Sequence, residues 1–426
     1  MGLMISLDDD TVSIDFTKNR TFRDWSELFK PEQVKAVPYF YTDNDGQQIV
    51  EEKEAFVRDL ISARYRLDLL GYSFARIKKL YEMDLRTLNC NVLNSNLSFN
   101  AFSDILTKSN IHKIAVSNCE MDDGQEEYSP SDFALKCLQD NQLYAELLNN
   151  ADDKNEVAFN ICYFLRKMDP GIILRLLAEN PYCAEVKVCW RFADLIKGDK
   201  VEKENIVHPL PSSKKIWIVT EGSSDTIVLK KTINELYPDI SDFFTFIDMK
   251  ENYPFTGTGN LYYFCCGLMK IGILNKVIVI FDNDTAGKEK YDKLMKAIND
   301  TSKDESRKLP DMPNLLITQL PNKTEFEHMV TNGPKGEAIE DINGTAVSIE
   351  CFLDFSSLKR LPVIDWKEPV GAGNKRQGAL RAKDKYTKKF RSANLFDGNY
   401  DVSKLRYLIN YLIEQWCEHT TKVDPI

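Results

Sequence analysis

Residues 216–225 read IWIVTEGSSD, and residues 277–287 read VIVIFDNDTAG. Each stretch begins with a short run of apolar, mostly β-branched residues, which is typical of a strand buried on both faces of a sheet. Each run ends abruptly at acidic residues followed by a glycine, which indicates a turn into a helix. The two stretches therefore predict two parallel strands, each followed by a helix and each carrying carboxylates at its end.

The same alternation of strand and helix extends on both sides of these stretches. The predicted elements are strands at 216–220, 243–247, 277–281 and 314–320 and helices at about 224–237, 258–272 and 286–300. Strands that alternate with helices indicate an α/β fold, in which a parallel sheet is flanked by helices. We expect this domain to span residues 212–330, after a polar segment with two prolines at 201–215.

A mainly helical domain is expected before this sheet, at residues 1–205, with a small β element at its start. Its first helix is predicted from the spacing of Phe56, Leu60, Ala63, Leu67 and Leu70, and it ends at Gly71. Further helices are predicted at 73–82, 132–150, 155–168, 171–178 and 182–197. Residues 331–426 are expected to form a helical, basic C-terminal region that completes the site and ends in an amphipathic helix from Leu405 to Trp416.

The composition narrows the class of protein. A length of 426 residues with 43% hydrophobic and 11% aromatic residues predicts two to three folded domains. No apolar run approaches the roughly 18 residues that cross a bilayer, and the start lacks the pattern of a signal peptide, so we expect a cytoplasmic protein without a membrane partner. The ten cysteines include no CxxC pair, which predicts reduced thiols and no structural zinc.

Four acidic residues follow the two decisive strands. Glu221 and Asp225 come after the first, and Asp282 and Asp284 come after the second. Ligands bind beyond the carboxyl ends of the strands in open parallel sheets, so these side chains are expected to share one small volume. Clustered carboxylates repel one another unless a hard cation binds between them. The sequence therefore predicts a site for Mg²⁺ or Mn²⁺.

The motif Glu221-Gly222-x-x-Asp225, followed by Asp282-x-Asp284-x-x-Gly287, resembles the Toprim domain of topoisomerases, bacterial primases, ribosomal-RNA maturases and OLD-type nucleases, over about residues 212–320. The opening MGLMISL, with FRDWSELF, VPYFYT and RLDLLGYSF after it, is similar to the N-terminal domain of bacterial HEPN/Toprim-associated proteins. The resemblance implies an OLD-like Toprim nuclease that acts as an effector of anti-phage defence, with an ATPase sensor or another defence protein as a partner and a homo-oligomer as a further possibility.

The resemblance also implies a further catalytic acid and a basic residue. Glu350, in VSIECFL, is similar in context to the additional acid of Toprim nucleases and is the candidate metal ligand, with Glu340 and Asp341 as rivals. Lys383, or Lys385, is the candidate basic residue beside the scissile phosphate. The expected catalytic set is therefore Glu221, Asp282, Asp284, Glu350 and Lys383.

A basic stretch stands out in a chain whose formal net charge is −10. Residues 359–391 hold eleven basic and three acidic side chains, which predicts a docking strip for a phosphate backbone beside an acidic metal site. The candidate nucleic-acid-binding residues are Lys375, Arg376, Arg381, Lys383, Lys385, Lys388 and Lys389.

Three classes of function stay open at this point. The favoured class is a Mg²⁺-dependent nuclease that cleaves phosphodiester bonds in RNA or DNA. The second is a non-catalytic or ATPase-regulated binding or toxin module. The third is an enzyme of the topoisomerase or primase type. None of the four histidines follows an arginine at the spacing of HEPN ribonucleases, so the N-terminal domain is not expected to be a HEPN catalyst.

Overall fold

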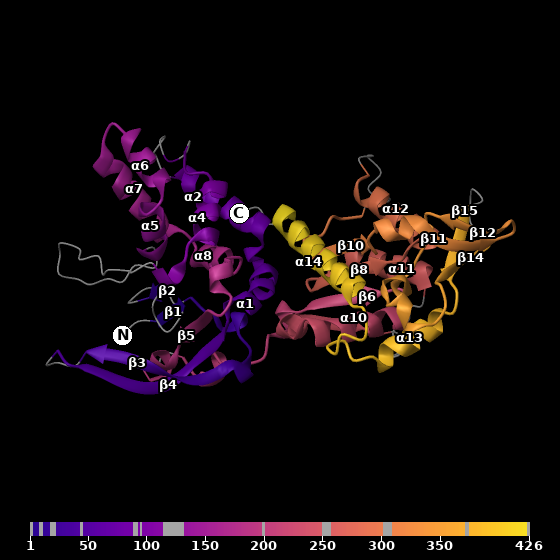
Figure 1. Cartoon of the computed structure of the whole chain (residues 1–426), viewed down its shortest axis with the longest axis horizontal. Helices are drawn as coiled ribbons and strands as arrows, with labels where there is room; N and C mark the ends of the chain where they lie inside the picture. The colour runs from indigo at the N-terminus through magenta and orange to yellow at the C-terminus, as the bar shows by residue number, and fades with distance from the viewer. Residues whose placement is uncertain are drawn as a thin grey trace. The chain divides into compact units, whose positions relative to one another are not determined.

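The computed structural model divides the chain into two compact units, Met1–Leu210 with Ile426 and Pro211–Pro425 (Figure 1). It describes residues 3–7, 12–17, 23–42, 46–87, 93, 96–113, 132–197, 201–248, 257–300, 309–370 and 375–423. Within these ranges no helix combines the length and the apolar character needed to cross a membrane.

The N-terminal unit is built on a five-stranded antiparallel sheet. Its strand order is β2-β1-β5-β4-β3, so the last strand of the unit is inserted between strands from its beginning. The strands are β1 (Leu3–Leu7), β2 (Val12–Thr17), β3 (Val34–Thr42), β4 (Gln48–Asp59) and β5 (Lys187–Arg191). Trp190 of β5 stacks on Phe56 of β4, with 6.0 Å between the ring centroids, and anchors the core of the unit.

Helices pack against this sheet and complete the core. They are α1 (Leu60–Leu67), α2 (Phe74–Thr87), α4 (Phe99–Lys108), α5 (Asp132–Gln139), α6 (Gln142–Asn149), α7 (Lys154–Lys167), α8 (Pro170–Leu177) and the short α9 (Ala193–Lys197). Gly71 has a φ of 98°, a left-handed conformation that ends the helical segment after α1, as the sequence predicts.

The expectation of a mainly helical N-terminal domain is wrong in two places. The predicted first helix begins at Leu60, because Phe56 still belongs to β4, a 12-residue strand whose first half is exposed and charged. The predicted helix at 182–197 is interrupted by β5, and only its last part is helical, as α9. In this central strand Val188, Cys189 and Trp190 are all buried, so the alternation that marks a strand in sequence is missing.

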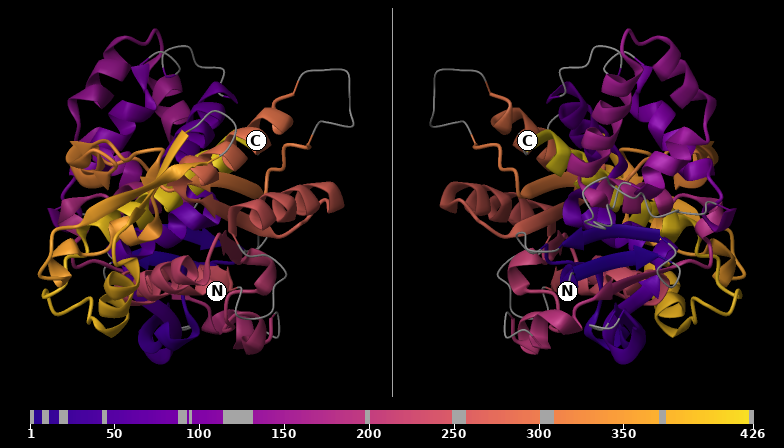
Figure 2. Two further views of the ribbon diagram at one scale, coloured as in Figure 1. Left: turned by 90° about the vertical axis from the view of Figure 1, so that its right-hand side faces the viewer. Right: turned by 90° about the vertical axis from the view of Figure 1, so that its left-hand side faces the viewer.

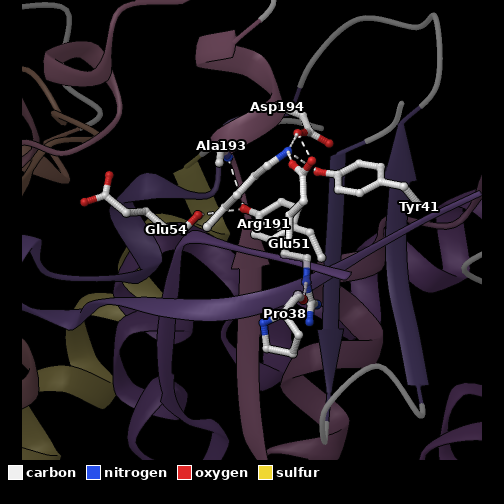
Figure 3. Close-up of polar contacts among 9 residues, drawn as sticks. Pro38, Tyr41, Glu51, Glu54, Arg191, Ala193 and Asp194 are labelled. Atoms are coloured by element: carbon white, nitrogen blue, oxygen red, sulfur yellow. Dashed lines mark hydrogen bonds and ion pairs between the residues drawn. The ribbon is translucent and has the colours of Figure 1, made fainter. Parts of the chain in front are cut away.

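A polar network ties the β3–β4 hairpin to the start of α9 (Figure 3). Tyr41 donates a hydrogen bond to Asp194 at 2.8 Å, and Lys53 reaches Asp194 at 3.1 Å and the Tyr41 hydroxyl at 2.6 Å. Arg191 donates to the Pro38 carbonyl at 3.1 Å. Lys53 and Arg191 therefore satisfy acceptors that the hairpin presents to the rest of the sheet.

A buried ion pair joins two helical segments of the same unit. The Arg175 side chain, which is 3% exposed, donates to Asp68 at 2.7 Å and to Glu179 at 2.8 Å. Burial raises the pKa of Asp68, and the neighbouring Arg175 opposes that rise. The pair therefore holds α8 to the end of α1, and each charge depends on the other for its solvation.

We expect Asp68→Ala to lower the free energy of unfolding of this unit by about 3 kcal/mol, because it leaves the Arg175 guanidinium buried with fewer partners. Urea denaturation of the full chain measures this. The matched control is Asp104→Ala, which removes an exposed ion pair to Lys108 and should cost under about 1 kcal/mol. Equal losses in the two variants would contradict the assigned role of the buried pair.

The C-terminal unit contains the predicted parallel sheet. Its order is β10-β8-β6-β7, and every neighbouring pair is parallel. The strands are β6 (Ile216–Thr220), β7 (Phe244–Ile247), β8 (Lys276–Phe281) and β10 (Leu315–Gln319), and the helices between them are α10 (Ser223–Leu236), α11 (Gly257–Ile271) and α12 (Thr285–Ile298). The predicted strand–helix alternation is confirmed.

Helices cover both faces of this sheet. Val277, Val279 and Phe281 of β8 pack with α11 and α12 in one core. The other face is covered by α10 and by the terminal helix α14 (Ser403–Val423). The stripe predicted for this terminal helix, from Leu405 to Trp416, is buried.

The expectation that residues 331–426 are helical is only partly right. A four-stranded sheet of order β12-β11-β14-β15 follows the parallel sheet, and only then come α13 (Lys383–Ser392) and α14. The strands of this sheet are β11 (Met329–Gly333), β12 (Gly336–Glu340), β14 (Val363–Val370) and β15 (Lys375–Leu380). These short strands carry many polar residues, and β12 is almost wholly exposed. The sequence therefore lacks the hydrophobic alternation that would predict them.

Candidate metal centre

The ends of β6 and β8 meet at one edge of the parallel sheet. These strands are hydrogen-bonded neighbours, with Thr220 in register with Ile280. Glu221 is the first residue after β6, and Asp282 is the first residue after β8. The sheet itself therefore brings these two acids together, as expected from the carboxyl ends of adjacent parallel strands.

Glu221 links three segments with its carboxylate. Its Oε1 accepts the backbone N–H of Asp282 at 3.0 Å, and its Oε2 accepts the hydroxyl of Thr258 at the start of α11. Its backbone carbonyl accepts the N–H of Gly257 at 3.1 Å. Glu221 is thus fixed by bonds from the two neighbouring strand–helix connections.

Asp284 caps the helix that follows it. Its Oδ1 accepts the N–H of Gly287 at 2.7 Å, and its Oδ2 accepts a hydrogen bond from Gln377 of β15 at 2.9 Å. Gly287 has no room for a side chain, because a Cβ there would lie 2.2 Å from the Asp282 carbonyl oxygen and 3.1 Å from Glu221 Oε1. The glycine of the motif therefore lets α12 start against the acids.

Glu350 reaches the same place from the C-terminal part of the chain. The two-residue strand β9 (Asn283–Asp284) pairs with β13 (Ala346–Val347), and the short helix with Glu350 (Ile349–Phe352) follows directly. Glu350 is 3% exposed and accepts the hydroxyl of Ser348 at 2.7 Å. Gly378 of β15 packs its backbone against Ala346, where a Cβ would lie 2.8 Å from the alanine side chain.

Asp225 lies buried behind the site. Its carboxylate accepts the backbone N–H of Gly222 at 2.9 Å and the hydroxyl of Ser224 at 3.3 Å, which completes the first turn of α10. Burial, together with the charges of Glu350 and Glu221, raises the pKa of Asp225 to about 7. The pKa of Asp225 therefore depends on acids from both sides of the site.

The other acids show the same electrostatic coupling. Burial raises the pKa of Glu221 to about 7, against the lowering effect of its hydrogen bonds from Thr258 and Asp282. Burial also raises the pKa of Asp282 well above its usual value, and the neighbouring charges of Asp225, Glu221, Asp284 and Glu350 act in the same direction. The structure thus brings all five predicted acids into one cluster, which we call the carboxylate cluster.

Positive groups near the carboxylate cluster are few. Burial raises the pKa of Asp284, and the N–H groups of α12, Lys367 of β14 and Gln377 oppose the rise. The helices α10, α11 and α12 all begin at the cluster, and helix N-termini favour negative charge. These partial charges do not match the formal charge of the carboxylates, so the donor set suits a divalent cation with a preference for oxygen ligands.

Among the described residues, no group of three or more His, Cys, Asp or Glu side chains is placed to hold a metal ion as it stands. Mg²⁺ needs no such cage, because it usually keeps several waters and binds one or two carboxylates together with a phosphate of the substrate. Glu221, Asp282 and Asp284 retain exposed surface, whereas Asp225 and Glu350 are buried. The residues present fit such a partly hydrated ion, which the three partly exposed acids would hold.

The rival candidates for the additional acid lie in other contacts. Glu340 of β12 accepts hydrogen bonds from Thr331, Trp366 and Arg376, which lower its pKa. Asp341 is exposed and accepts the N–H of Asn343 at 2.8 Å. The structure places Glu350, rather than either rival, against Asp225 and Asp282.

The predicted basic residues lie on β15 and α13. Arg376 pairs with Glu340 at 3.0 Å, and Arg381 pairs with Asp365. Lys383, Lys385, Lys388 and Lys389 are exposed on α13 and make no ion pair within the described ranges. The side chain of Lys375 lies outside the described part of the chain. Among the described contacts none joins Lys383 to the carboxylate cluster, and its catalytic role stays a prediction.

Three residues of the site were missed from sequence. Thr258 and Gln377 donate to Glu221 and Asp284, and Lys367 is the basic side chain that affects Asp284. Lys367 and Gln377 fall within the basic stretch 359–391, but their place opposite each other on β14 and β15 is set by strand register. No local pattern distinguishes them from other polar residues on exposed strands.

One comparison with known proteins gives a match. The family model described as HEPN/Toprim N-terminal domain 1 matches residues 1–214, half of the chain. The chain belongs to this family, which confirms the HEPN/Toprim-associated resemblance seen in its opening residues. No curated protein and no solved structure matches the chain.

We expect Gly287→Ala to destabilise the C-terminal unit by about 1–3 kcal/mol, because the new methyl group would displace the Asp282 carbonyl and the Glu221 carboxylate. The matched control is Gly267→Ala in the middle of α11, where a Cβ meets nothing within 4 Å. That variant should be neutral or more stable by up to about 1 kcal/mol. Urea unfolding compares them, and a harmless Gly287→Ala would contradict the close packing described here.

A second prediction concerns charge. Because the folded chain holds protons on these acids more tightly than the unfolded chain does, protonation of the cluster stabilises the fold. This stabilisation is complete below about pH 4 and is lost as pH rises through about 7. In EDTA at pH 8, Asp282→Asn should therefore melt at a higher temperature than the wild type, and this difference should shrink toward pH 4.

Adding Mg²⁺ or Mn²⁺ at pH 8 should raise the melting temperature of the wild type more than that of Asp282→Asn. Asp292→Asn, on an exposed position of α12, is the control and should follow the wild type. Identical melting curves of wild type and Asp282→Asn, with and without metal, would show that these acids do not form a coupled site.

Proposed function

We propose that the chain is a Toprim nuclease that hydrolyses phosphodiester bonds in RNA or DNA with Mg²⁺ or Mn²⁺, and that it serves as an effector of anti-phage defence. The observation that carries this proposal is the convergence of Glu221, Asp282 and Asp284 at the ends of two adjacent parallel strands. Membership in the HEPN/Toprim family supports a nuclease-associated function.

In this proposal Glu221, Asp282 and Asp284 hold the cation, because these residues are partly exposed at the edge of the sheet. When bound, Mg²⁺ supplies Lewis-acid stabilisation of the charge that develops at the phosphoryl group. Glu350 and Asp225 maintain the geometry from behind, through Ser348 and the first turn of α10. The buried acids also keep the site negative enough to require the cation.

The protein's own residues must also fix the acids' orientation. Thr258 and the Asp282 N–H engage both oxygens of Glu221, so that carboxylate cannot rotate freely. Asp284 is held by Gly287 and Gln377 in the same way. Lys367, whose charge lowers the pKa of Asp284, could offset the charge of an incoming phosphate. Such fixed ligands are what positioning of a phosphodiester requires.

The test is cleavage by the purified full chain with Mg²⁺ or Mn²⁺, using total RNA, supercoiled DNA and single-stranded DNA. Glu221→Gln, Asp282→Asn and Asp284→Asn should each lose at least about 100-fold in cleavage rate, because each removes a charged ligand of the cation. Glu350→Gln should also lose activity, whereas Glu337→Gln, exposed on β12, should cut as the wild type does.

Two results would refute the proposal. The first is wild-type cleavage by all three single variants of the exposed acids. The second is a wild-type chain that cuts none of the three substrates with either metal while it remains folded by circular dichroism.

A further inference from the structure

The two helices beside the carboxylate cluster share a surface that the metal site does not use. α11 begins at Glu221, through the bonds of Gly257 and Thr258, and α12 begins at Asp284. The helices pack against each other on one face of the parallel sheet (Figures 1 and 2). Their outer surface therefore leads away from the cluster along both helix axes.

Two tyrosines lie on this surface, one turn from the cluster. Tyr262 follows Thr258 by four residues, so both side chains share a face of α11 and are about 6 Å apart along the axis. Tyr263 is 71% exposed, and its ring lies 5.3 Å from that of Tyr262 at an interplanar angle of 77°. The core of α11 uses Leu261, Cys265, Leu268 and Met269 instead, so packing within the unit does not explain Tyr263.

Two lysines of α12 lie beside Tyr262. The Lys293 ammonium lies 4.6 Å from the centroid of the Tyr262 ring, and Lys290 lies near the Tyr262 hydroxyl. Lys288, one turn into α12, is exposed beside Asn283 and Gly344 at the cluster. Lys293 and Lys296 form no ion pair with a carboxylate within the described ranges, although Glu289 and Asp292 lie four residues before them. Aromatic rings and lysines without a carboxylate partner in the described ranges thus lie on one surface, which also carries the exposed acids Glu289 and Asp292.

We propose that this surface, formed by Tyr262, Tyr263, Lys293 and Lys296, binds unpaired nucleotides of single-stranded RNA or DNA that enters the carboxylate cluster. The inference rests on the proposed function and adds the class of substrate. Base stacking on exposed aromatic rings with lysines along the backbone is how single strands are bound without sequence preference. A duplex hides its base faces, so an exposed tyrosine contributes little to duplex binding.

A second copy of the chain is the competing occupant, since Ile271 and Leu274 are exposed at the far end of α11. Charge favours nucleic acid, because α12 carries four lysines against two acids, and this net charge of +2 would repel the same surface of a second copy. The phosphate backbone supplies the opposite charge, and it must in any case approach the cluster from which both helices begin.

The test measures binding of labelled single-stranded RNA, single-stranded DNA and a short duplex by fluorescence polarisation. All variants carry Asp282→Asn, so that no substrate is cut. Tyr263→Leu should weaken binding of at least one type of single strand by about 5- to 150-fold, the range expected for loss of one stacked base, and Tyr263→Phe should restore it. Comparing the RNA and DNA arms identifies the strand preferred.

Two further variants sharpen this test. Tyr163→Leu is the matched control, because Tyr163 is also exposed beside a lysine, Lys167 at 5.7 Å, but lies on α7 of the N-terminal unit. It should bind as the parent does. Lys293→Gln should weaken single-strand binding and reduce the slope of log affinity against log salt by about 0.7, the value for one phosphate contact.

The inference is overturned if Tyr263→Leu binds single strands as its parent does, if it loses duplex binding equally, or if no single strand binds. It is also overturned if light scattering shows that Tyr263→Leu changes only the oligomeric state. These outcomes differ from failure of the proposed function, which is read from cleavage by chains with and without Asp282→Asn. A chain that cuts in an Asp282-dependent way, but is indifferent to Tyr263, keeps the nuclease proposal and loses this one.

Discussion

The carboxylate of Glu221 is the contact on which the geometry of the C-terminal unit's site depends. One oxygen accepts the backbone N–H of Asp282 at the end of the adjacent strand, and the other accepts the hydroxyl of Thr258 at the start of α11. A single acid therefore holds three connections in register. The same arrangement places like charges together, so the folded chain carries an electrostatic strain that a bound cation would relieve.

Much of the parallel sheet was predictable because its strands are buried on both faces. Apolar runs of this length, such as IWIVT and VIVIF, predict buried strands, and acids and glycines mark where each strand stops. The strands that were missed lack this signal. β5 is central and buried from Val188 to Arg191, and β12 is exposed on nearly every residue, so each loses the alternation of burial for a different reason.

Acids that directly follow a strand of the parallel sheet could be predicted from the strand pattern in the sequence, whereas acids that reach the carboxylate cluster by other connections could not. Glu221 and Asp282 follow neighbouring strands, and their proximity follows from parallel pairing alone. Glu350 arrives through the pairing of β13 with β9, two strands of two residues, so only the resemblance to Toprim nucleases pointed to it. Thr258, Lys367 and Gln377 depend on side-chain directions and strand register, which a single sequence does not specify.

The distribution of positive charge shows the same limit of sequence reasoning. A window along the chain detects the basic stretch at 359–391, yet Arg376 and Arg381 of that stretch already pair with Glu340 and Asp365. The lysines of α12 are interspersed with Glu289 and Asp292, so a window averages them away. In the folded chain the ammonium of Lys293 lies over the Tyr262 ring of α11, although Glu289 shares its face of α12. Charge available to a polyanion is therefore a property of the folded surface, and an acidic chain can present a cationic path to an acidic site.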